Sequence, residues 1–152
     1  MRIVETIRLL LSPRSRLLNQ LAETAADAEM LAANLTRHAD MCTYPTLRAG
    51  LEEQAAAETA RANAMRQLLL QNGVSPRFPS KPFHEGSSNW ERLRNDLALQ
   101  VKILRALHFQ LSEWTGIDPQ IAQRLREFAD EEDRLIEQLR DLTLKCDPQA
   151  LD

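Results

Sequence analysis

Apolar residues recur at alternating steps of three and four along four long stretches of this chain, and this spacing restricts the fold more than any other feature. In residues 13–39 these positions are Leu17, Leu21, Ala28, Leu31 and Leu35. Such steps place the side chains on one face of a helix. The same spacing returns in three further stretches. In residues 45–72 the apolar positions are Leu47, Leu51, Ala55, Ala62, Met65 and Leu69, and in residues 88–115 they are Leu93, Leu97, Leu104, Leu107, Leu111 and Trp114. In residues 118–145 they are Ile121, Leu125, Phe128, Leu135, Leu139 and Leu142. The sequence therefore predicts four long amphipathic helices around one core.

Residues that favour helix ends stand at the borders of these stretches. Ser12 precedes Pro13, and Asp118 precedes Pro119, which is the order expected of an N-cap followed by proline at the first helical position. Gly73 follows the second stretch and suits the left-handed conformation that often ends a helix. The chain has only 4 glycines. Its abundant Ala, Leu, Arg and Glu are strong helix formers, so we expect an all-α fold.

The connections between the stretches differ in length, and this difference predicts the topology. Short loops join residues 13–72 into one antiparallel hairpin and residues 88–145 into a second. Residues 73–87 between them contain Pro76, Pro79 and Pro82, which argue against a helix or strand. Extended at about 3.3 Å per residue, this segment is long enough to run along helices of about 40 Å. We therefore expect one four-helix domain over residues 1–152, with a long crossover between its second and third helices.

Residues 1–11, MRIVETIRLLL, predict a short amphipathic helix ahead of the bundle. Ile3, Ile7 and Leu10 share one face, which we expect to pack on the bundle or on a second subunit. The segment is too polar for a signal-peptide core, because it also carries Arg2, Glu5 and Arg8. No run of apolar residues is long enough for a membrane-spanning helix. We therefore expect no membrane span and a cytoplasmic location.

The two predicted hairpins resemble each other in sequence. Residues 16–22 read RLLNQLA and residues 92–98 read RLRNDLA, at an offset of 76. At this offset Leu17 matches Leu93, and Leu31 matches Leu107. After the turns Pro45 matches Pro119, and Glu58 matches Glu132. This agreement predicts an internal repeat of one helical hairpin.

A polar residue interrupts each apolar stripe near its middle. These residues are Thr24, Glu58, Gln100 and Glu132, one on each predicted helix. In a bundle of antiparallel hairpins the four positions are expected to meet in one layer. Arg61 lies one turn after Glu58 on the same face. The sequence therefore predicts a buried polar layer in which Arg61 neutralises Glu58, Glu132 or both.

Two hairpins joined by a long crossover, with carboxylates at mid-bundle, resemble the ferritin-like superfamily of rubrerythrin and ferritin-type bundles. The resemblance implies a di-iron site in which each half supplies a Glu from its first helix and a Glu-x-x-His from its second. This chain departs from that motif, because Arg61 and Leu135 stand where the histidines belong. Thr24 and Gln100 stand where the first-helix carboxylates belong. The resemblance thus implies the fold together with a degenerate metal site.

The net charge and the spacing of the cysteines argue against two classes of ligand, nucleic acids and cysteine-bound metal ions. The net charge of -3 argues against nucleic acid as a partner. Cys42 and Cys146 fit no metal-binding spacing and are read as reduced thiols. His38 aligns with Trp114 in the repeat, so we expect it to pack at one end of the bundle. The sequence contains no Ser-His-Asp set and no glycine-rich phosphate loop.

These observations favour a non-catalytic ferritin-like bundle that acts through association, as a homodimer or larger homo-oligomer, without a cofactor. Two alternatives remain open. The first is a metal-binding bundle that uses only carboxylates, namely Glu23, Glu58, Glu131 and Glu132. The second is a bundle that binds a small ligand or lipid in space left by small side chains on the first hairpin, namely Ala25, Ala28, Ala32, Ala55 and Ala62.

Overall fold

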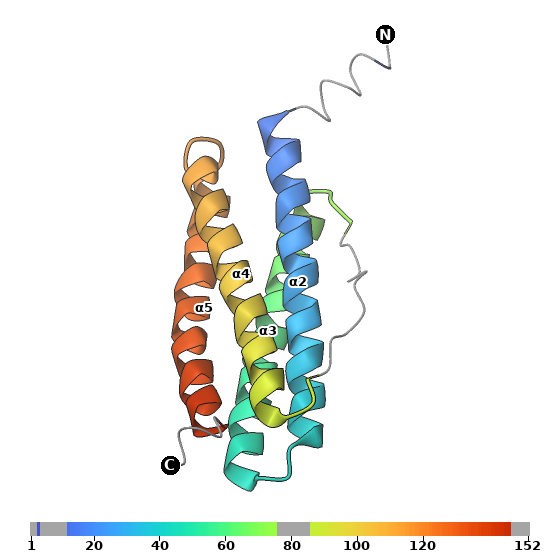
Figure 1. The fold of residues 1–152 in the computed structure, drawn as a ribbon. Coiled ribbons are helices and arrows are strands. Elements are labelled where there is room, and N and C mark those ends of the chain that lie inside the picture. The colour runs from blue at the N-terminus through green and yellow to red at the C-terminus, as the bar shows by residue number, and fades with distance from the viewer. Residues whose placement is uncertain (1–2, 4–11, 76–85, 147–152) are drawn as a thin grey trace.

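The computed structural model describes residues 3, 12–75 and 86–146, and these form four helices and no strand (Figure 1). The helices are α2 (Pro13–Met41), α3 (Pro45–Gln71), α4 (Asn89–Trp114) and α5 (Pro119–Cys146). The predicted helix ends differ from these by at most two residues. The prediction of an all-helical chain with four packed helices is confirmed.

The helix ends follow from local hydrogen bonding. The side chains of Ser12 and Ser88 each accept a hydrogen bond from the backbone N–H three residues later, at 3.1 and 3.2 Å. Asp118 Oδ1 accepts from two backbone N–H groups at the start of α5. Tyr44 is the N-cap of α3 but makes no side-chain cap bond. Gly73 follows α3 with a φ of 76°, a conformation that glycine adopts without strain.

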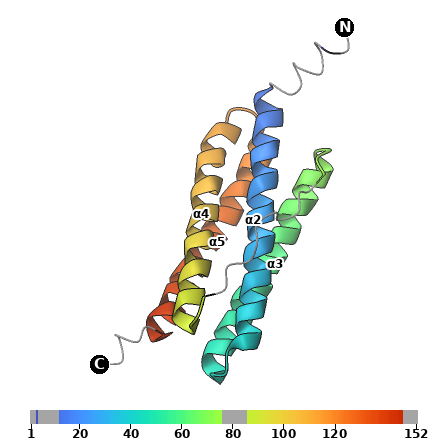
Figure 2. The ribbon, with the colours of Figure 1, turned by 45° about the vertical axis from the view of Figure 1, so that its right-hand side comes forward.

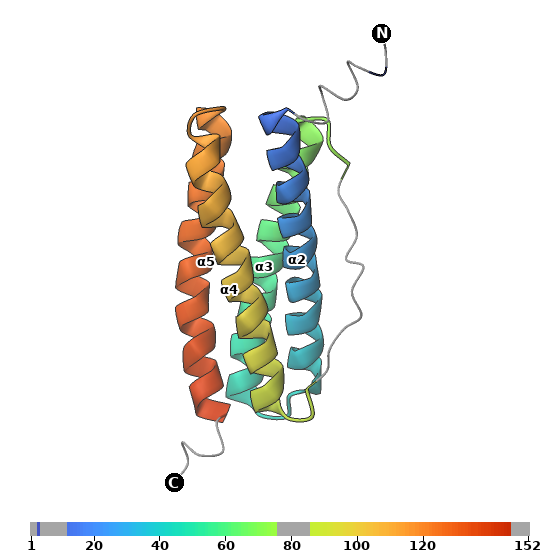
Figure 3. The same cartoon turned by 45° about the horizontal axis from the view of Figure 1, so that its top comes forward.

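The two hairpins lie side by side, as Figure 2 shows. Helix α2 packs on α3 within its hairpin and on α4 across the bundle, whereas α5 packs on α4 and α3. The pairs α2/α5 and α3/α4 are therefore the diagonals of the bundle. Figure 3 shows that α3 and α4 run in the same direction, so all neighbouring helices are antiparallel. Buried leucine and alanine side chains from all four helices fill one core.

Two predicted features lie largely outside the described residues. The crossover is described only at residues 73–75 and 86–87, so its predicted lengthwise path stays a prediction. The predicted leading helix is described only at Ile3, whose side chain is exposed. None of the helices in the described ranges is both apolar enough and long enough to cross a lipid bilayer.

Helix α4 is rotated about its axis relative to the predicted apolar stripe. Its buried residues are Leu93, Asp96, Gln100, Ile103, Leu107, Gln110 and Trp114. By contrast, Leu97, Leu104 and Leu111 are only half-buried. The rotation is tolerated because each buried polar side chain of α4 finds a polar partner on another helix, namely His38, Glu58 or Thr24.

Candidate functional site

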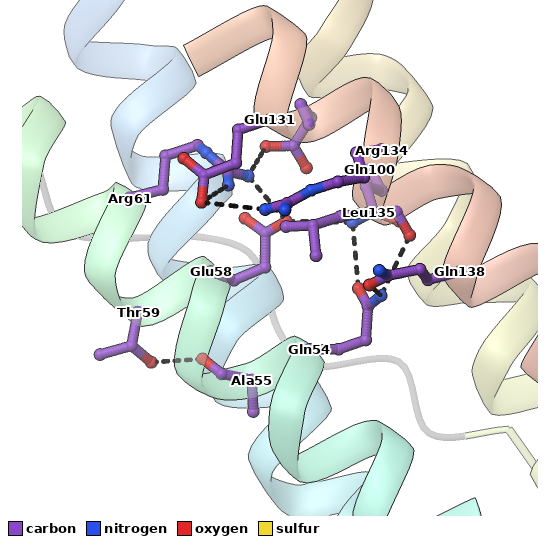
Figure 4. Close-up of polar contacts among 11 residues, drawn as sticks. Gln54, Ala55, Glu58, Thr59, Arg61, Gln100, Glu131, Arg134, Leu135 and Gln138 are labelled. Atoms are coloured by element: carbon purple, nitrogen blue, oxygen red, sulfur yellow. Dashed lines mark hydrogen bonds and ion pairs between the residues drawn. The ribbon is translucent and has the colours of Figure 1, made fainter. Parts of the chain in front are cut away.

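The buried polar centre of the bundle begins with Glu58 and Arg61 on α3. The two residues are three apart, so they share a helix face, and that face is turned into the core. The Arg61 residue is only 2% exposed, and Glu58 and Glu132 are fully buried. Arg61 Nη1 donates to Glu58 Oε1 at 3.2 Å and also to Glu132 Oε2 on α5. One guanidinium thus links two buried carboxyl groups on neighbouring helices (Figure 4).

The cluster reaches the surface through Glu131. Arg61 Nη2 lies 3.1 Å from Glu131 Oε1, and the Glu131 side chain is 43% exposed. The same Glu131 oxygen lies 3.8 Å from Arg134 Nη2, which belongs to an exposed side chain. Glu131 therefore forms the solvent-facing edge of the cluster, where water and salt screen its interaction with Arg61.

Two glutamine side chains add hydrogen bonds to the cluster, Gln100 from α4 and Gln54 from α3. Gln100 Nε2 donates to Glu58 Oε1 at 3.0 Å across the diagonal of the bundle. Gln54 Nε2 donates to the backbone oxygen of Leu135 on α5 at 3.0 Å. Figure 4 shows the Gln54 side chain pointing towards Leu135 and Gln138 of α5. We call Gln54, Glu58, Arg61, Gln100, Glu131 and Glu132 the carboxylate–guanidinium cluster.

Burial dominates the electrostatics of this cluster. Burial, followed by a hydrogen bond and the charge of Glu132, raises the pKa of Glu58 to about 9, although Arg61 and Gln100 oppose this shift. Burial also acts against the charge of Arg61, but the negative charges of Glu132 and Glu58 outweigh it and raise the pKa of Arg61. Arg61 is therefore a permanent cation, whereas Glu58 holds a proton at neutral pH.

Thr24, which was expected in this layer, and Glu23, which was expected only as a ligand in the carboxylate metal alternative, lie apart from the cluster. Thr24 is buried, but its hydroxyl accepts from Gln110 Nε2 at 2.9 Å and donates to the backbone oxygen of Gln20 at 3.1 Å. It thus belongs to a separate polar contact between α2 and α4. Glu23 is exposed on α2. Among the described contacts the cluster takes no side chain from α2; its members are Gln54, Glu58, Arg61, Gln100, Glu131 and Glu132.

The donor set of the cluster does not fit the di-iron site that the resemblance implies. The Arg61 guanidinium lies among the carboxyl groups that would have to ligate the metal ions, and a cation at this point repels metal ions. Across residues 12–75 and 86–146, no three His, Cys, Asp or Glu side chains are arranged so as to hold a metal ion. We therefore derive no metal chemistry for this centre.

A second buried ionisable pair escaped the sequence analysis. His38 Nδ1 lies 2.5 Å from Asp96 Oδ2, and both side chains are almost fully buried. Burial raises the pKa of Asp96, and the hydrogen bond from His38 opposes this shift. The available signal was the spacing of Leu93, Asp96 and Gln100 on one face of α4. This spacing does not single out the face with Asp96, because the neighbouring leucines of α4 form an equally regular apolar stripe.

One end of the bundle carries an apolar hollow, which we call the end recess. Its volume is about 590 Å³, and it lies where α3 and α4 begin and α5 ends. Its apolar walls include Leu47, Trp90 and Leu142. Among its lining residues, Tyr44 is 66% exposed and Trp90 is half-buried. The end recess is therefore a largely apolar hollow that is partly open to solvent.

The five alanines expected to leave space on the first hairpin lie in the core of the bundle. These residues, Ala25, Ala28, Ala32, Ala55 and Ala62, are all buried. An open groove of about 540 Å³ lies between α2 and α3, and its lining includes Ala39, Ala55, Ala56 and Ala60 together with Thr36, Asp40, Glu52, Thr59 and Asn63. One of the five expected alanines, Ala55, therefore borders this groove, which combines small apolar side chains with polar ones.

The polar groups of the carboxylate–guanidinium cluster mainly bind one another. Its members are glutamates, glutamines and one arginine, so it offers no serine, cysteine or histidine nucleophile. Arg61 pairs with the buried carboxyl groups of Glu58 and Glu132, which are therefore not free to contact a substrate. Comparison with known proteins assigns no family, since no protein-family model matches the chain and no curated protein matches it significantly.

Proposed function

We propose that this chain is a non-catalytic helical bundle of the ferritin-like type that has lost its metal site. We further propose that it acts in the cytoplasm by associating with protein chains, first of all with copies of itself. The observation that carries the proposal is the position of Arg61, whose buried guanidinium contacts three glutamates at mid-bundle. A centre neutralised in this way holds the helices together but leaves no open position for chemistry.

Physical chemistry supports a structural role for this centre. Buried carboxyl groups without a partner are costly, and a divalent ion is one way to offset that cost. Arg61 meets the same need with a covalently attached cation that cannot dissociate. Gln100 and Gln54 add hydrogen bonds that tie α3 to α4 and α5. The cluster thereby favours one alignment of the helices along their axes. A surface that binds another chain needs such a fixed alignment to keep its shape.

The end recess supports association. Large exposed apolar side chains gathered around a hollow mark protein interaction sites more often than isolated ones do. Tyr44, Trp90 and Leu142 all line the recess, and Tyr44 is the most exposed of the three. Aromatic residues in such a pocket are the usual anchors of an interface. We therefore assign the contact between copies to this end of the bundle.

The mass of the protein in solution tests the proposed association. The parent chain is expected to form a dimer or larger assembly in light scattering coupled to size exclusion. A double variant, Tyr44→Glu with Trp90→Glu, is expected to lower the mass towards that of the monomer, because it places charges inside the proposed interface. Leu70→Glu is the matched control, since the residue Leu70 is 51% exposed but lies at the end of α3 opposite to Tyr44. A monomeric parent would contradict the proposal.

Metal analysis tests the other half of the proposal. The purified protein is expected to hold no stoichiometric iron or manganese, and adding either ion is expected to leave its melting temperature unchanged. A stabilising ligand would raise that temperature. Two equivalents of bound metal ion per chain would instead support the alternative with carboxylate ligands.

A further inference from the structure

The end recess is partly open to solvent on a single chain. It holds about 590 Å³ between the starts of α3 and α4 and the end of α5, with Leu47, Trp90 and Leu142 among its apolar walls. Tyr44, which also lines it, is 66% exposed, and Trp90 is half-buried. A hollow of this size and lining accommodates a few large apolar side chains from a partner.

The leading segment, residues 1–11, carries side chains of this kind. Ile3, Ile7 and Leu10 follow one another at steps of four and three, which places them on one face of a helix. Ile3, the one described residue of the segment, is helical and 75% exposed, so the bundle of its own chain does not cover its side chain. Helices that bind in apolar hollows of a partner use anchors at this spacing.

The length of the chain separates the leading segment from the recess of its own copy. Helix α2 begins at Pro13 and continues for 29 residues, about 43 Å, to Met41, which precedes Tyr44 of the recess by three residues. The ten residues from Ile3 to Ser12 span about 15 Å as a helix and about 33 Å even when fully extended. Ile3 is therefore too far from the recess of its own chain to enter it, but it can enter the recess of a second copy.

We propose that the leading segment of one copy fills the end recess of a second copy, with its apolar face against Trp90 and Leu142. Two copies that lie side by side in antiparallel orientation each bring their leading segment to the recess of the other. This arrangement is closed and two-fold symmetric, which is the commonest form of a homo-oligomer. The inference rests on the proposed function, because it names the two surfaces that meet when copies of the chain associate.

Two variants that each lack one half of the contact test the inference. The truncated variant lacks residues 2–11, and the recess variant carries Tyr44→Glu with Trp90→Glu. Each variant alone is expected to be a monomer in light scattering coupled to size exclusion, because every contact between identical copies then lacks one partner. Mixed in equal amounts, the two are expected to form a 1:1 dimer, since one keeps its leading segment and the other keeps its recess. A contact of recess with recess would not be restored by mixing.

Tryptophan fluorescence shows whether the restored contact lies at the recess. In the truncated variant Trp90 is half-buried at the recess, whereas Trp114 is fully buried at the other end of α4. Adding the recess variant, which has no Trp90, is expected to shift the emission of the truncated variant to shorter wavelength, because apolar side chains replace water around Trp90. If the recess variant loses its helical circular dichroism, Tyr44→Glu alone takes its place, since this residue is largely exposed.

A matched pair of substitutions in the leading segment tests its apolar face. Ile7→Gln is expected to raise the Kd of the dimer by about 10-fold or more, because it removes an apolar anchor from the recess. Arg8→Gln introduces the same side chain one position later, away from the face of Ile3, Ile7 and Leu10, and is expected to leave the Kd unchanged. Analytical ultracentrifugation of the full-length chains measures both.

The results that would overturn the inference differ in what else they affect. A truncated variant that remains a dimer, a mixture without the 1:1 complex, or equal effects of Ile7→Gln and Arg8→Gln would each overturn it and leave the proposed association standing. A mass that grows with concentration beyond two chains would overturn the closed antiparallel arrangement. A monomeric parent would contradict the proposed function as well.

Discussion

Arg61 illustrates how much a single buried side chain decides in this protein. Its guanidinium contacts Glu58 on its own helix and Glu132 on α5, and all three side chains are buried. A buried ion pair adds little stability compared with apolar residues of the same volume, but breaking one side of it is costly. Replacing Arg61, Glu58 and Glu132 together by apolar residues is therefore expected to cost less stability than removing Arg61 alone.

The first prediction at this scale concerns the free energy of unfolding. Arg61→Ala is expected to lower it by about 3–5 kcal/mol, because the variant leaves buried carboxyl groups without their cation. Replacing Arg61, Glu58 and Glu132 together by apolar residues is expected to cost far less. Urea denaturation followed by circular dichroism measures both. Arg134→Ala is the control, since this exposed side chain is expected to change stability by less than about 0.5 kcal/mol. An Arg61→Ala variant as stable as the parent would refute the burial of this side chain.

The second residue-scale prediction concerns pH. Burial, with the hydrogen bond and charge of Glu132, raises the pKa of Glu58 from 4.5 to about 9. Between these values the folded chain keeps a proton that the unfolded chain releases. The stabilisation is therefore fully present below about pH 4.5 and is lost as the pH rises through about 9. Denaturation across this range is expected to show falling stability in the parent.

Glu58→Gln provides the comparison for the pH prediction. The amide has the same shape as the protonated carboxyl group, with one donor end and one acceptor end, but it does not titrate. The variant is expected to fold and to depend less on pH than the parent does. Glu127→Gln on the exposed face of α5 is the control and is expected to keep the slope of the parent. Equal slopes in Glu58→Gln and the parent would show that Glu58 is ionised throughout.

At the scale of the helices, the helix ends depend on residues close together in the chain, whereas the contacts between helices depend on how the helices are aligned. Ser88 caps α4 by accepting a hydrogen bond from the backbone N–H of Glu91, while Glu91 Oε2 accepts from the backbone N–H of Ser87. These bonds depend on residues within a few positions of each other. The pair His38 and Asp96, in contrast, joins α2 to α4 and depends on how the two helices are aligned.

The cap of α4 gives an element-scale prediction. Ser88→Ala is expected to lower the free energy of unfolding by about 1 kcal/mol, because it leaves backbone N–H groups of the first turn without a partner. Ser112→Ala is a matched control on the same helix, since Ser112 is exposed and bonds only to the backbone oxygen of Phe109. The control is expected to be neutral or slightly stabilising, as alanine favours helix more than serine does. Equal effects of the two substitutions would refute the capping role.

The buried pair between α2 and α4 gives a second element-scale prediction. Asp96→Leu is expected to destabilise by about 1–3 kcal/mol, because it removes the buried carboxyl group that contacts His38 Nδ1. Asp96→Asn keeps the volume and a hydrogen-bonding oxygen and is expected to cost less. Thermal and urea denaturation of the two variants measure the difference. If both variants matched the parent, the pair would contribute nothing to the contact between the helices.

At the scale of the whole molecule, the leading segment bears on stability and assembly. Residues 1–11 carry more apolar side chains than an idle terminus needs, as the sequence shows. Deleting them is therefore expected to lower the melting temperature or to change the mass in solution. Deleting the polar residues 147–152 serves as the control and is expected to do neither. An unchanged mass and melting temperature after deletion of residues 1–11 would show that the segment does not contribute.

The sequence by itself determined the helices, most of their caps, and the pairing of Glu58 with Arg61. Each of these depends on residues close together in the chain, where proline, the N-caps and the three-residue spacing act directly. It also singled out Gln100 and Glu132 as polar interruptions of apolar stripes. Thr24, however, fits the same pattern and contacts Gln110 instead.

Only the tertiary structure decided which of these side chains meet. An α4 with leucine on several sides can turn different faces inward, and apolar periodicity does not distinguish them. The chosen rotation buries Asp96, Gln100 and Gln110 because His38, Glu58 and Thr24 lie opposite them. The contact of Arg61 with Glu132 likewise depends on the register between α3 and α5. Such registers depend on the packing and hydrogen bonds of all four helices together, which no single stretch of sequence contains.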